Sequence, residues 1–89
     1  MNTKVEGDVA VATQEEGLHN LIIWNDDVTT FTAVQNALIE ICKHTYLQAV
    51  QCSFIIHHNG KCSVKRGTYK KLRPMREAIS DRKITATIE

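Results

Sequence analysis

The chain has 89 residues, of which 43% are hydrophobic and 24% are charged, as expected for one small folded domain with a single core. No apolar run approaches the roughly 18–20 residues that cross a membrane, and no leader of the signal-peptide type opens the sequence. The three cysteines are an odd number, which argues against a disulfide framework. We therefore expect a reduced, cytoplasmic protein rather than a secreted or membrane protein.

The N-terminal segment, residues 1–17, contains no aromatic residue, leucine or isoleucine, so it offers little apolar area for burial. We expect it to form a disordered, flexible tail ahead of one folded domain over residues 18–89. That domain opens with residues 18–24, an apolar and β-branched run that is typical of a buried strand.

Two helices are predicted after this strand. The first spans residues 32–43, because apolar side chains recur along one face at helical spacing, at Val34, Ala37, Leu38 and Ile41. Threonines just before and within its first turn supply candidate N-caps. The second spans residues 46–58, with Thr45 as its cap and with Asn59 and Gly60 at its end.

The remaining residues predict two further strands and one short helix. Residues 61–66 alternate in polarity, as an edge strand does, and residues 84–89 alternate with one apolar face. Pro74 interrupts an otherwise helical stripe, and proline costs about 3 kcal/mol inside a helix but nothing at its first turn. We therefore predict a turn over residues 68–72 and a short helix that begins near Pro74. The fold class is α+β, in the order β-α-α-β-α-β, with a three-stranded antiparallel sheet packed against helices.

Three oxygen acceptors follow the first strand at Asn25, Asp26 and Asp27, and no lysine or arginine stands within several positions of them. The simplest interpretation is an Asx turn that ends the strand, since Asn and Asp side chains accept hydrogen bonds from the backbone just after them. The alternative is a binding site for a positively charged ligand, which would supply the missing partner.

A second polar feature stands at the end of the predicted second helix. Three side chains and a glycine share one face there, at Ser53, Ile56, His57 and Gly60. The histidine closes a stripe that is otherwise small or apolar. Histidine in such a place is most often a structural group, and we weigh that alternative against a ligand-binding role.

Both features are sequence motifs as well as polar clusters. The pattern N-D-D-x-T occurs at residues 25–29, and the pattern H-x-x-G-K occurs at residues 57–61. From residue 18 to the ending TATIE, the chain resembles the ClpS family of adaptor proteins for Clp proteases, which carries both motifs at this spacing. The resemblance implies recognition of N-degrons: such adaptors bind proteins whose first residue is Leu, Phe, Tyr or Trp. They deliver them to the N-terminal domain of a hexameric Clp AAA+ unfoldase.

The resemblance also assigns roles to individual residues. The substrate α-amino group, largely an ammonium with three donors near neutral pH, is expected to bind Asn25, Asp26 and His57. Asp27 is expected to support the loop. A hydrophobic pocket for the first side chain falls on Thr29, Phe31, Val34, Ser53, Ile56 and Ile84. The alternative for the aliphatic members of this list is a purely structural place in the core.

Two positions depart from the family pattern. Ser53 stands where relatives carry a bulky apolar residue, often methionine, that gates the pocket, so we expect a pocket that is wider or admits water. The last helix is shorter than in relatives and contains Pro74, so no docking residue is assigned by resemblance. A basic run is either a docking surface for the unfoldase or a solvated face, and it consists of Lys65, Arg66, Lys70, Lys71, Arg73 and Arg76.

The distribution of charge supports one rival interpretation. Residues 1–60 carry two lysines against seven acidic residues, a net charge of −5, whereas residues 61–89 carry nine basic against three acidic residues, a net charge of +6. The basic segment 61–76, with Tyr69 available to stack on bases, therefore supports an alternative function as a small nucleic-acid-binding module. This alternative is disfavoured because the segment contains only one aromatic residue and because the first half of the chain is acidic.

Two further rivals are a metal site and an enzyme. The C-x4-H-H-x3-C spacing from Cys52 to Cys62 is not a common zinc pattern, although all four side chains are ligand types. Asp26 or Asp27 with His57 resembles an acid–base pair but lacks an evident nucleophile. We therefore expect a monomeric adaptor that is not an enzyme, needs no metal or other cofactor, and binds neither nucleic acid nor membrane.

Overall fold

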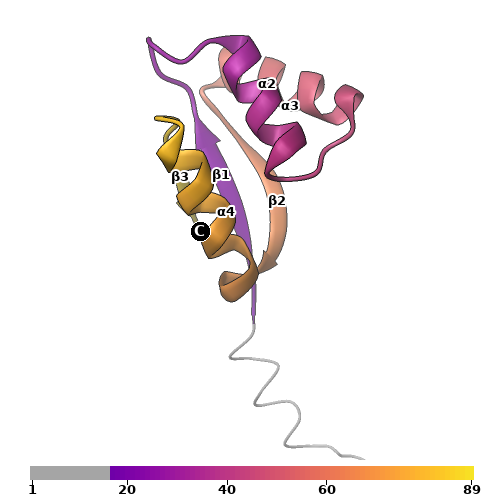
Figure 1. Ribbon diagram of the computed structural model, residues 1–89, viewed down its shortest axis with the longest axis vertical. Coiled ribbons are helices and arrows are strands. Elements are labelled where there is room, and N and C mark those ends of the chain that lie inside the picture. Colours follow the sequence, from indigo (N-terminus) through magenta and orange to yellow (C-terminus); the bar gives the residue numbers. More distant parts are fainter. Residues whose placement is uncertain (1–16) are drawn as a thin grey trace, which may run out of the picture.

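The computed structural model describes residues 17–89, so the tail predicted over residues 1–17 lies, apart from Gly17, outside the described residues. Six elements follow one another in the predicted order (Figure 1). Their bounds are β1 (Leu18–Trp24), α2 (Phe31–Glu40), α3 (Tyr46–Asn59), β2 (Lys61–Thr68), α4 (Tyr69–Asp81) and β3 (Ala86–Ile88). This arrangement confirms the predicted α+β class.

The three strands form one antiparallel sheet in the order β2-β1-β3, with β1 at its centre. Trp24 at the end of β1 stands opposite Lys61 at the start of β2. On the other side of β1, Asn20 and Glu89 exchange two backbone hydrogen bonds of 2.8 Å. The central place of β1 accounts for its apolar sequence, and β2 is the edge strand that its alternating sequence predicts.

The helices cover the sheet in two places (Figure 1). α4 packs across all three strands, whereas α3 packs on β2 and α2 packs on α3. Leu21 and Ile23 of β1, Leu38 of α2, and Leu72 and Ile79 of α4 are fully buried between these layers. The α2–α3 hairpin therefore covers one end of the sheet, which brings the start of α2 and the end of α3 close to the end of β1.

Threonine side chains begin all three helices. Thr30, Thr45 and Thr68 each accept a hydrogen bond from the backbone N–H three residues further on, at 3.1, 3.1 and 3.2 Å. Thr45 also forms a capping box with Gln48. At the other end of α3, Gly60 takes the left-handed conformation with φ of 94°. The predicted caps of this helix are thus confirmed.

The first helix ends earlier than predicted. α2 stops at Glu40 and not at residue 43, because Lys43 takes a left-handed conformation with φ of 61°. The backbone N–H of His44 then bonds to the carbonyl of Leu38 at 3.1 Å, which closes the end of the helix. The apolar periodicity continues to Ile41, so periodicity alone overestimates the length.

The last strand is also shorter than the predicted span of residues 84–89. Lys83 turns the chain with φ of 67°, and the N–H of Ile84 bonds to the carbonyl of Ile79 in α4 at 3.4 Å. Ile84 therefore belongs to the connection between helix and strand, where its side chain is 2% exposed.

The prediction for residues 68–82 was wrong at Pro74. α4 runs continuously from Tyr69 to Asp81, with Pro74 as its sixth residue. Proline removes only one helical hydrogen bond here, to the carbonyl of Lys70, and both residues lie on the exposed side, where water can reach that carbonyl. Burial of the stripe that includes Leu72 and Ile79 outweighs the local penalty.

The cost of this proline is measurable. Pro74→Ala restores the missing N–H and should raise the free energy of unfolding by about 1–2 kcal/mol. The interior proline penalty of about 3 kcal/mol is partly offset, because the unfolded chain gains freedom worth about 1 kcal/mol. Urea unfolding followed by circular dichroism measures the change, with Lys70→Ala on the same exposed side as the control. An unchanged midpoint in Pro74→Ala would show that the helix carries no penalty at this position.

Candidate functional site

The end of β1 and the end of α3 are joined by one backbone hydrogen bond. The N–H of Asn25 donates to the carbonyl of Gly60 at 2.8 Å, one residue beyond the pair formed by Trp24 and Lys61. The N–H of Gly60 in turn donates to Ile56 at 3.0 Å and closes the last turn of α3. The two sequence motifs, far apart in the chain, therefore meet at this point.

Asp26 holds the loop that follows β1. Its Oδ1 accepts hydrogen bonds from the N–H groups of Val28 at 2.8 Å and Thr29 at 2.6 Å, and its Oδ2 accepts one from the Thr29 hydroxyl at 2.8 Å. These three hydrogen bonds lower the pKa of the Asp26 carboxyl. The bond from the Thr29 N–H has the largest effect, followed by the bonds from the Val28 N–H and the Thr29 hydroxyl. The acceptor cluster thus contains the Asx turn that its sequence allows.

Loop support therefore comes from Asp26, whereas we predicted it for Asp27. Asp27 is exposed, and its carboxylate accepts no hydrogen bond from residues 17–89. The difference lies in side-chain direction, because the Asp26 carboxylate accepts from the N–H groups two and three residues further on, as in an Asx turn. For Asp26 these are the amides of the loop itself, just before Thr30 begins α2.

A small hollow lies between the loop, the start of α2 and the end of α3. Its floor consists of the buried side chains of Val34, Ser53 and Ile56. Its rim consists of the exposed residues Asn25, Thr30, Phe31 and His57, with the half-buried Thr29 between rim and floor. The internal volume of about 10 Å³ is room for one water molecule. Seven of the ten predicted site residues therefore line one hollow.

Three predicted site residues lie outside this lining. Asp26 is half-buried and Asp27 is exposed, and neither belongs to the lining. Ile84 is buried in the core, and the neighbouring Lys83 carbonyl lies 3.5 Å from the Thr29 hydroxyl. Conversely, Thr30 lines the hollow although we assigned it no place in the site. Its position between two assigned residues and at a helix cap is the signal that the sequence offers.

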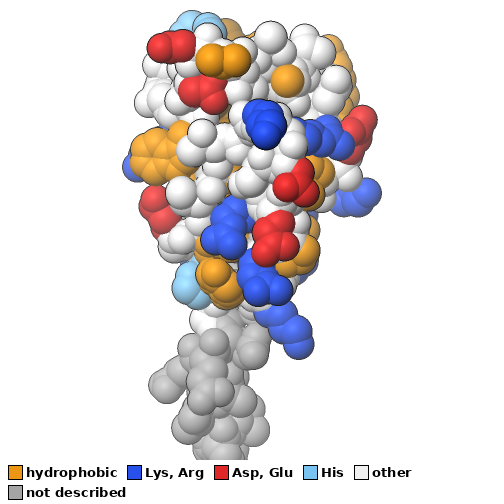
Figure 2. Space-filling view, turned by 60° about the vertical axis from the view of Figure 1, so that its left-hand side comes forward, with side chains coloured by type: hydrophobic (Ala, Val, Ile, Leu, Met, Phe, Trp, Pro, Cys, Tyr) orange, Lys and Arg blue, Asp and Glu red, His pale blue; other side chains and the backbone are white. Residues whose placement is uncertain are grey.

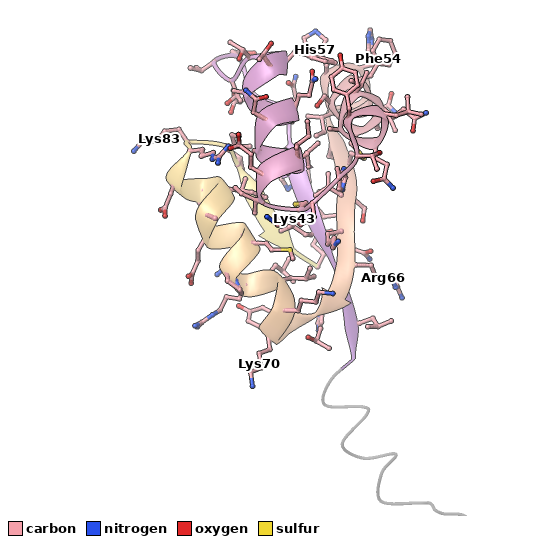
Figure 3. All side chains as sticks on the ribbon, turned by 45° about the vertical axis from the view of Figure 1, so that its right-hand side comes forward. Lys43, Phe54, His57, Arg66, Lys70 and Lys83 are labelled. Carbon is pink, nitrogen blue, oxygen red and sulfur yellow. The ribbon has the colours of Figure 1, made fainter. Side chains whose placement is uncertain are left out.

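His57 lies at the exposed end of α3, close to Phe54 (Figure 3). Its ring meets that of His58 edge to face, with 5.5 Å between the centroids, and His58 in turn stacks against Phe54 at 4.1 Å. Neither ring nitrogen of His57 is hydrogen-bonded to any described residue. Both nitrogens are therefore available to a ligand in the hollow, in contrast to a satisfied structural histidine.

None of the three cysteines is among the residues that line this hollow. Burial is the largest cause of a rise in the pKa of both Cys42 and Cys62 to about 11. These thiols are protonated near neutral pH, and the thiolate is the reactive form. Over residues 17–89, no three side chains of His, Cys, Asp or Glu are grouped in a way that holds a metal ion.

On the face drawn in Figure 2, lysine and arginine side chains do not form one continuous surface. Figure 2 shows lysine and arginine side chains interspersed with acidic ones, and Arg66 and Lys70 point in different directions in Figure 3. Arg73 pairs with Glu77 at 3.8 Å, and the Lys65 ammonium donates to a backbone carbonyl at 3.2 Å. A nucleic-acid backbone would need these charges along one track. None of the helices described is long and apolar enough to cross a membrane.

The conformation of Gly60 gives a first test of this geometry. Gly60→Ala should lower the free energy of unfolding by about 1–2 kcal/mol, because a left-handed conformation is costly for a residue with a Cβ. No heavy atom lies within 4 Å of the added carbon, so the backbone alone is responsible. Gly67→Ala is the matched control, since that glycine has no positive φ and its nearest neighbour is the flexible side chain of Lys71. Equal losses of unfolding free energy in both variants would contradict our explanation, which is that the left-handed backbone at Gly60 causes the loss.

Acid should weaken the loop through Asp26. Because its pKa is lowered in the folded protein, the folded state binds this proton less tightly than the unfolded chain, whose aspartate pKa is about 3.9. The stabilisation is therefore present above about pH 4 and is lost as the pH falls through the folded pKa.

We expect the urea concentration at the unfolding midpoint to decrease when the pH is lowered below about 4. The decrease should be smaller in Asp26→Asn, because the amide keeps an acceptor but does not titrate. Asp27→Asn removes the same charge one residue away, without a hydrogen bond from the described residues, and serves as the control. The explanation fails if both variants lose the acid dependence equally.

Comparisons with known proteins agree with the fold and with the expected family. The family model described as "ATP-dependent Clp protease adaptor protein ClpS" matches residues 14–87. No curated protein matches the chain. Among solved structures, that of Agrobacterium tumefaciens ClpS2 bound to L-phenylalaninamide is similar, with a TM-score of 0.71 and 16% sequence identity, covering 83% of this chain and 96% of the ClpS2 chain. The chain therefore belongs to the ClpS family of adaptor proteins for the ATP-dependent Clp protease.

Proposed function

We propose that this protein is an N-degron adaptor, which binds the free α-amino group and the bulky first side chain of a substrate protein. The observation that carries the proposal is the division of the hollow into a polar rim, with Asn25 and His57, and a buried floor, with Val34 and Ile56. Membership of the ClpS family supports it. The similar ClpS2 was solved with L-phenylalaninamide, a small molecule that joins an α-amino group to a benzyl side chain.

The rim suits an ammonium group. A free α-amino group has a pKa of about 7.7–8 and carries three donors when charged, whereas an internal amide has one donor and no charge. The Asn25 side-chain oxygen and a ring nitrogen of His57 supply two acceptors on the rim. Asp26 and Asp27 supply negative charge next to them, and charge-assisted hydrogen bonds are about twice as strong as neutral ones.

Asp26 combines support of the loop with attraction of the ligand. A carboxylate offers about four lone-pair sites. Three of them are used by the loop, two on Oδ1 and one on Oδ2, so one site on Oδ2 remains for an ammonium or for a bridging water. We propose Asp26 as an amine ligand in this restricted sense, and Asp27 as a further contribution to the negative potential.

The floor suits an apolar side chain, but the hollow must open to receive one. Burying a Leu or Phe side chain is worth about 1.5–3 kcal/mol, which favours it over Ala by one to two orders of magnitude. The present volume of about 10 Å³ is too small for either side chain. Phe31 stands at the rim as the first residue of α2 with 38% of its surface exposed, so we propose that it moves outward when a substrate binds.

Delivery to the unfoldase completes the proposed function. We propose that the protein binds substrates beginning with Leu, Phe, Tyr or Trp in the cytoplasm and presents them to the N-terminal domain of a hexameric Clp AAA+ unfoldase. No bond is made or broken by the adaptor in this scheme, so its residues act by binding and not by catalysis. Pocket residue Ile84 contributes from the core, behind Thr29.

The experiment measures the affinity of short labelled peptides by fluorescence anisotropy. Peptides that begin with Phe or Leu should bind, and their N-acetylated forms should not, because acetylation removes the charge and two donors. His57→Ala and Asn25→Ala should each weaken binding tenfold or more, through loss of a charge-assisted bond worth about 1.5–3 kcal/mol. His58→Ala is the matched control, because His58 is also exposed on α3 but does not line the hollow.

Two results would overturn the proposal. One is equal affinity for free and acetylated peptides, which would exclude capture of the amine. The other is an unchanged affinity in folded His57→Ala and Asn25→Ala, which would move the binding site elsewhere.

A further inference from the structure

The floor of the hollow contains one polar atom that has no partner. Ser53 is the one polar or charged residue that is buried in the described part of the chain, with 2% of its surface exposed. Its hydroxyl oxygen makes no hydrogen bond to any described residue. A serine within a helix often bonds to the carbonyl four residues earlier, which is that of Ala49 here, but Ser53 does not.

A buried hydroxyl without a partner is unfavourable, and most buried polar groups in folded proteins are hydrogen-bonded to protein or to ordered water. The unpaired oxygen of Ser53 is part of the lining of the hollow, whose volume of about 10 Å³ admits one water molecule. The structure thus provides a site in which the partner of this hydroxyl comes from outside the chain, either as water or as part of a ligand.

The position of Ser53 relative to the rim determines which ligand atom can reach it. The acceptors Asn25 and His57 are exposed on the rim, whereas Ser53 lies on the floor with Val34 and Ile56. A substrate whose amine is held at the rim points its first side chain towards the floor. The far end of that side chain therefore comes closest to the Ser53 hydroxyl.

We propose that Ser53 makes this adaptor prefer tyrosine over phenylalanine as the first residue of its substrates, a proposal that rests on the function proposed above. The two side chains have the same ring and require the same opening of the hollow, and they differ by one hydroxyl at the far end. Tyrosine pairs this hydroxyl with that of Ser53, directly or through the water. Phenylalanine expels the water and leaves the serine unpaired.

The rest of the floor limits the choice to uncharged side chains. Val34 and Ile56 are apolar and 6% and 2% exposed, and the floor contains no charged group. A charged first side chain would be buried there without a counter-charge, which is strongly unfavourable. A site that forms a hydrogen bond to a ligand hydroxyl also discriminates against the analogue that lacks it, because its own group is then left unpaired.

The experiment compares three peptides that differ only in the first residue, Tyr, Phe or Leu, on the wild type and on Ser53→Ala. The wild type should bind the Tyr peptide about threefold to tenfold more tightly than the Phe peptide, the range expected for one net hydrogen bond. In Ser53→Ala the ratio should fall to about one, with the affinity for the Phe peptide unchanged or increased. Ser63→Ala, which removes an exposed hydroxyl from β2, should keep the wild-type ratio.

Separate controls test whether the variant is folded and whether the proposed function holds. Ser53→Ala removes only the unpaired oxygen, and circular dichroism with urea unfolding confirms that the variant is folded. If the peptides bind through their free amine but the Tyr-to-Phe ratio is the same in both proteins, or favours Phe in the wild type, this inference is wrong and the proposed function stands. If no peptide with a free amine binds the folded wild type, both the inference and the proposed function are wrong.

Discussion

The site depends on the hydrogen bond between the N–H of Asn25 and the carbonyl of Gly60. It continues the β1–β2 pairing by one residue beyond Trp24, at the point where α3 turns into β2. The turn requires a left-handed residue, and Gly60 supplies it with φ of 94°. Because His57 lies in the last turn of that helix, the same bond holds the backbone of Asn25 close to the helix end that carries the imidazole. The end of β1 and the end of α3, which are far apart in the sequence, therefore both contribute to the rim of the hollow.

The acceptors on this rim are exposed, so their positions are held by the backbone rather than by packing. Asp26 uses three hydrogen bonds to fix the loop between β1 and α2, and the bonds that fix it also keep its pKa low. One carboxylate thus gives the loop its shape and provides a permanent negative charge near the site. A loop that is ordered before the ligand arrives loses less conformational entropy on binding, which is the benefit of preorganisation.

Much of the fold follows from local sequence patterns, and each error has its own physical cause. Apolar periodicity and the caps at Thr45 and Gly60 give the order of elements, because these signals act within a few residues. Pro74 is missed because burial of the apolar face of α4 overrides local preference, whereas the end of α2 is missed because the apolar periodicity continues to Ile41 and does not reveal the left-handed turn at Lys43. In the site, the resemblance to the ClpS family identifies seven of the eight residues that line the hollow. Which of two adjacent aspartates holds the loop, and that Thr30 borders the hollow, depend on side-chain directions that sequence does not show.

In the proposed function, the separation of rim and floor also separates affinity from selectivity. Every unblocked N-terminus presents the same ammonium, so the proposed contacts of Asn25 and His57 would add the same free energy for every first residue and would not discriminate among them. Discrimination must arise where substrates differ, at the floor. A floor of aliphatic side chains alone would rank first residues by apolar area and shape. We propose that with Ser53 among them hydrogen bonding enters the ranking, so that a substitution at this one position would change which substrates are chosen without changing how an N-terminus is recognised.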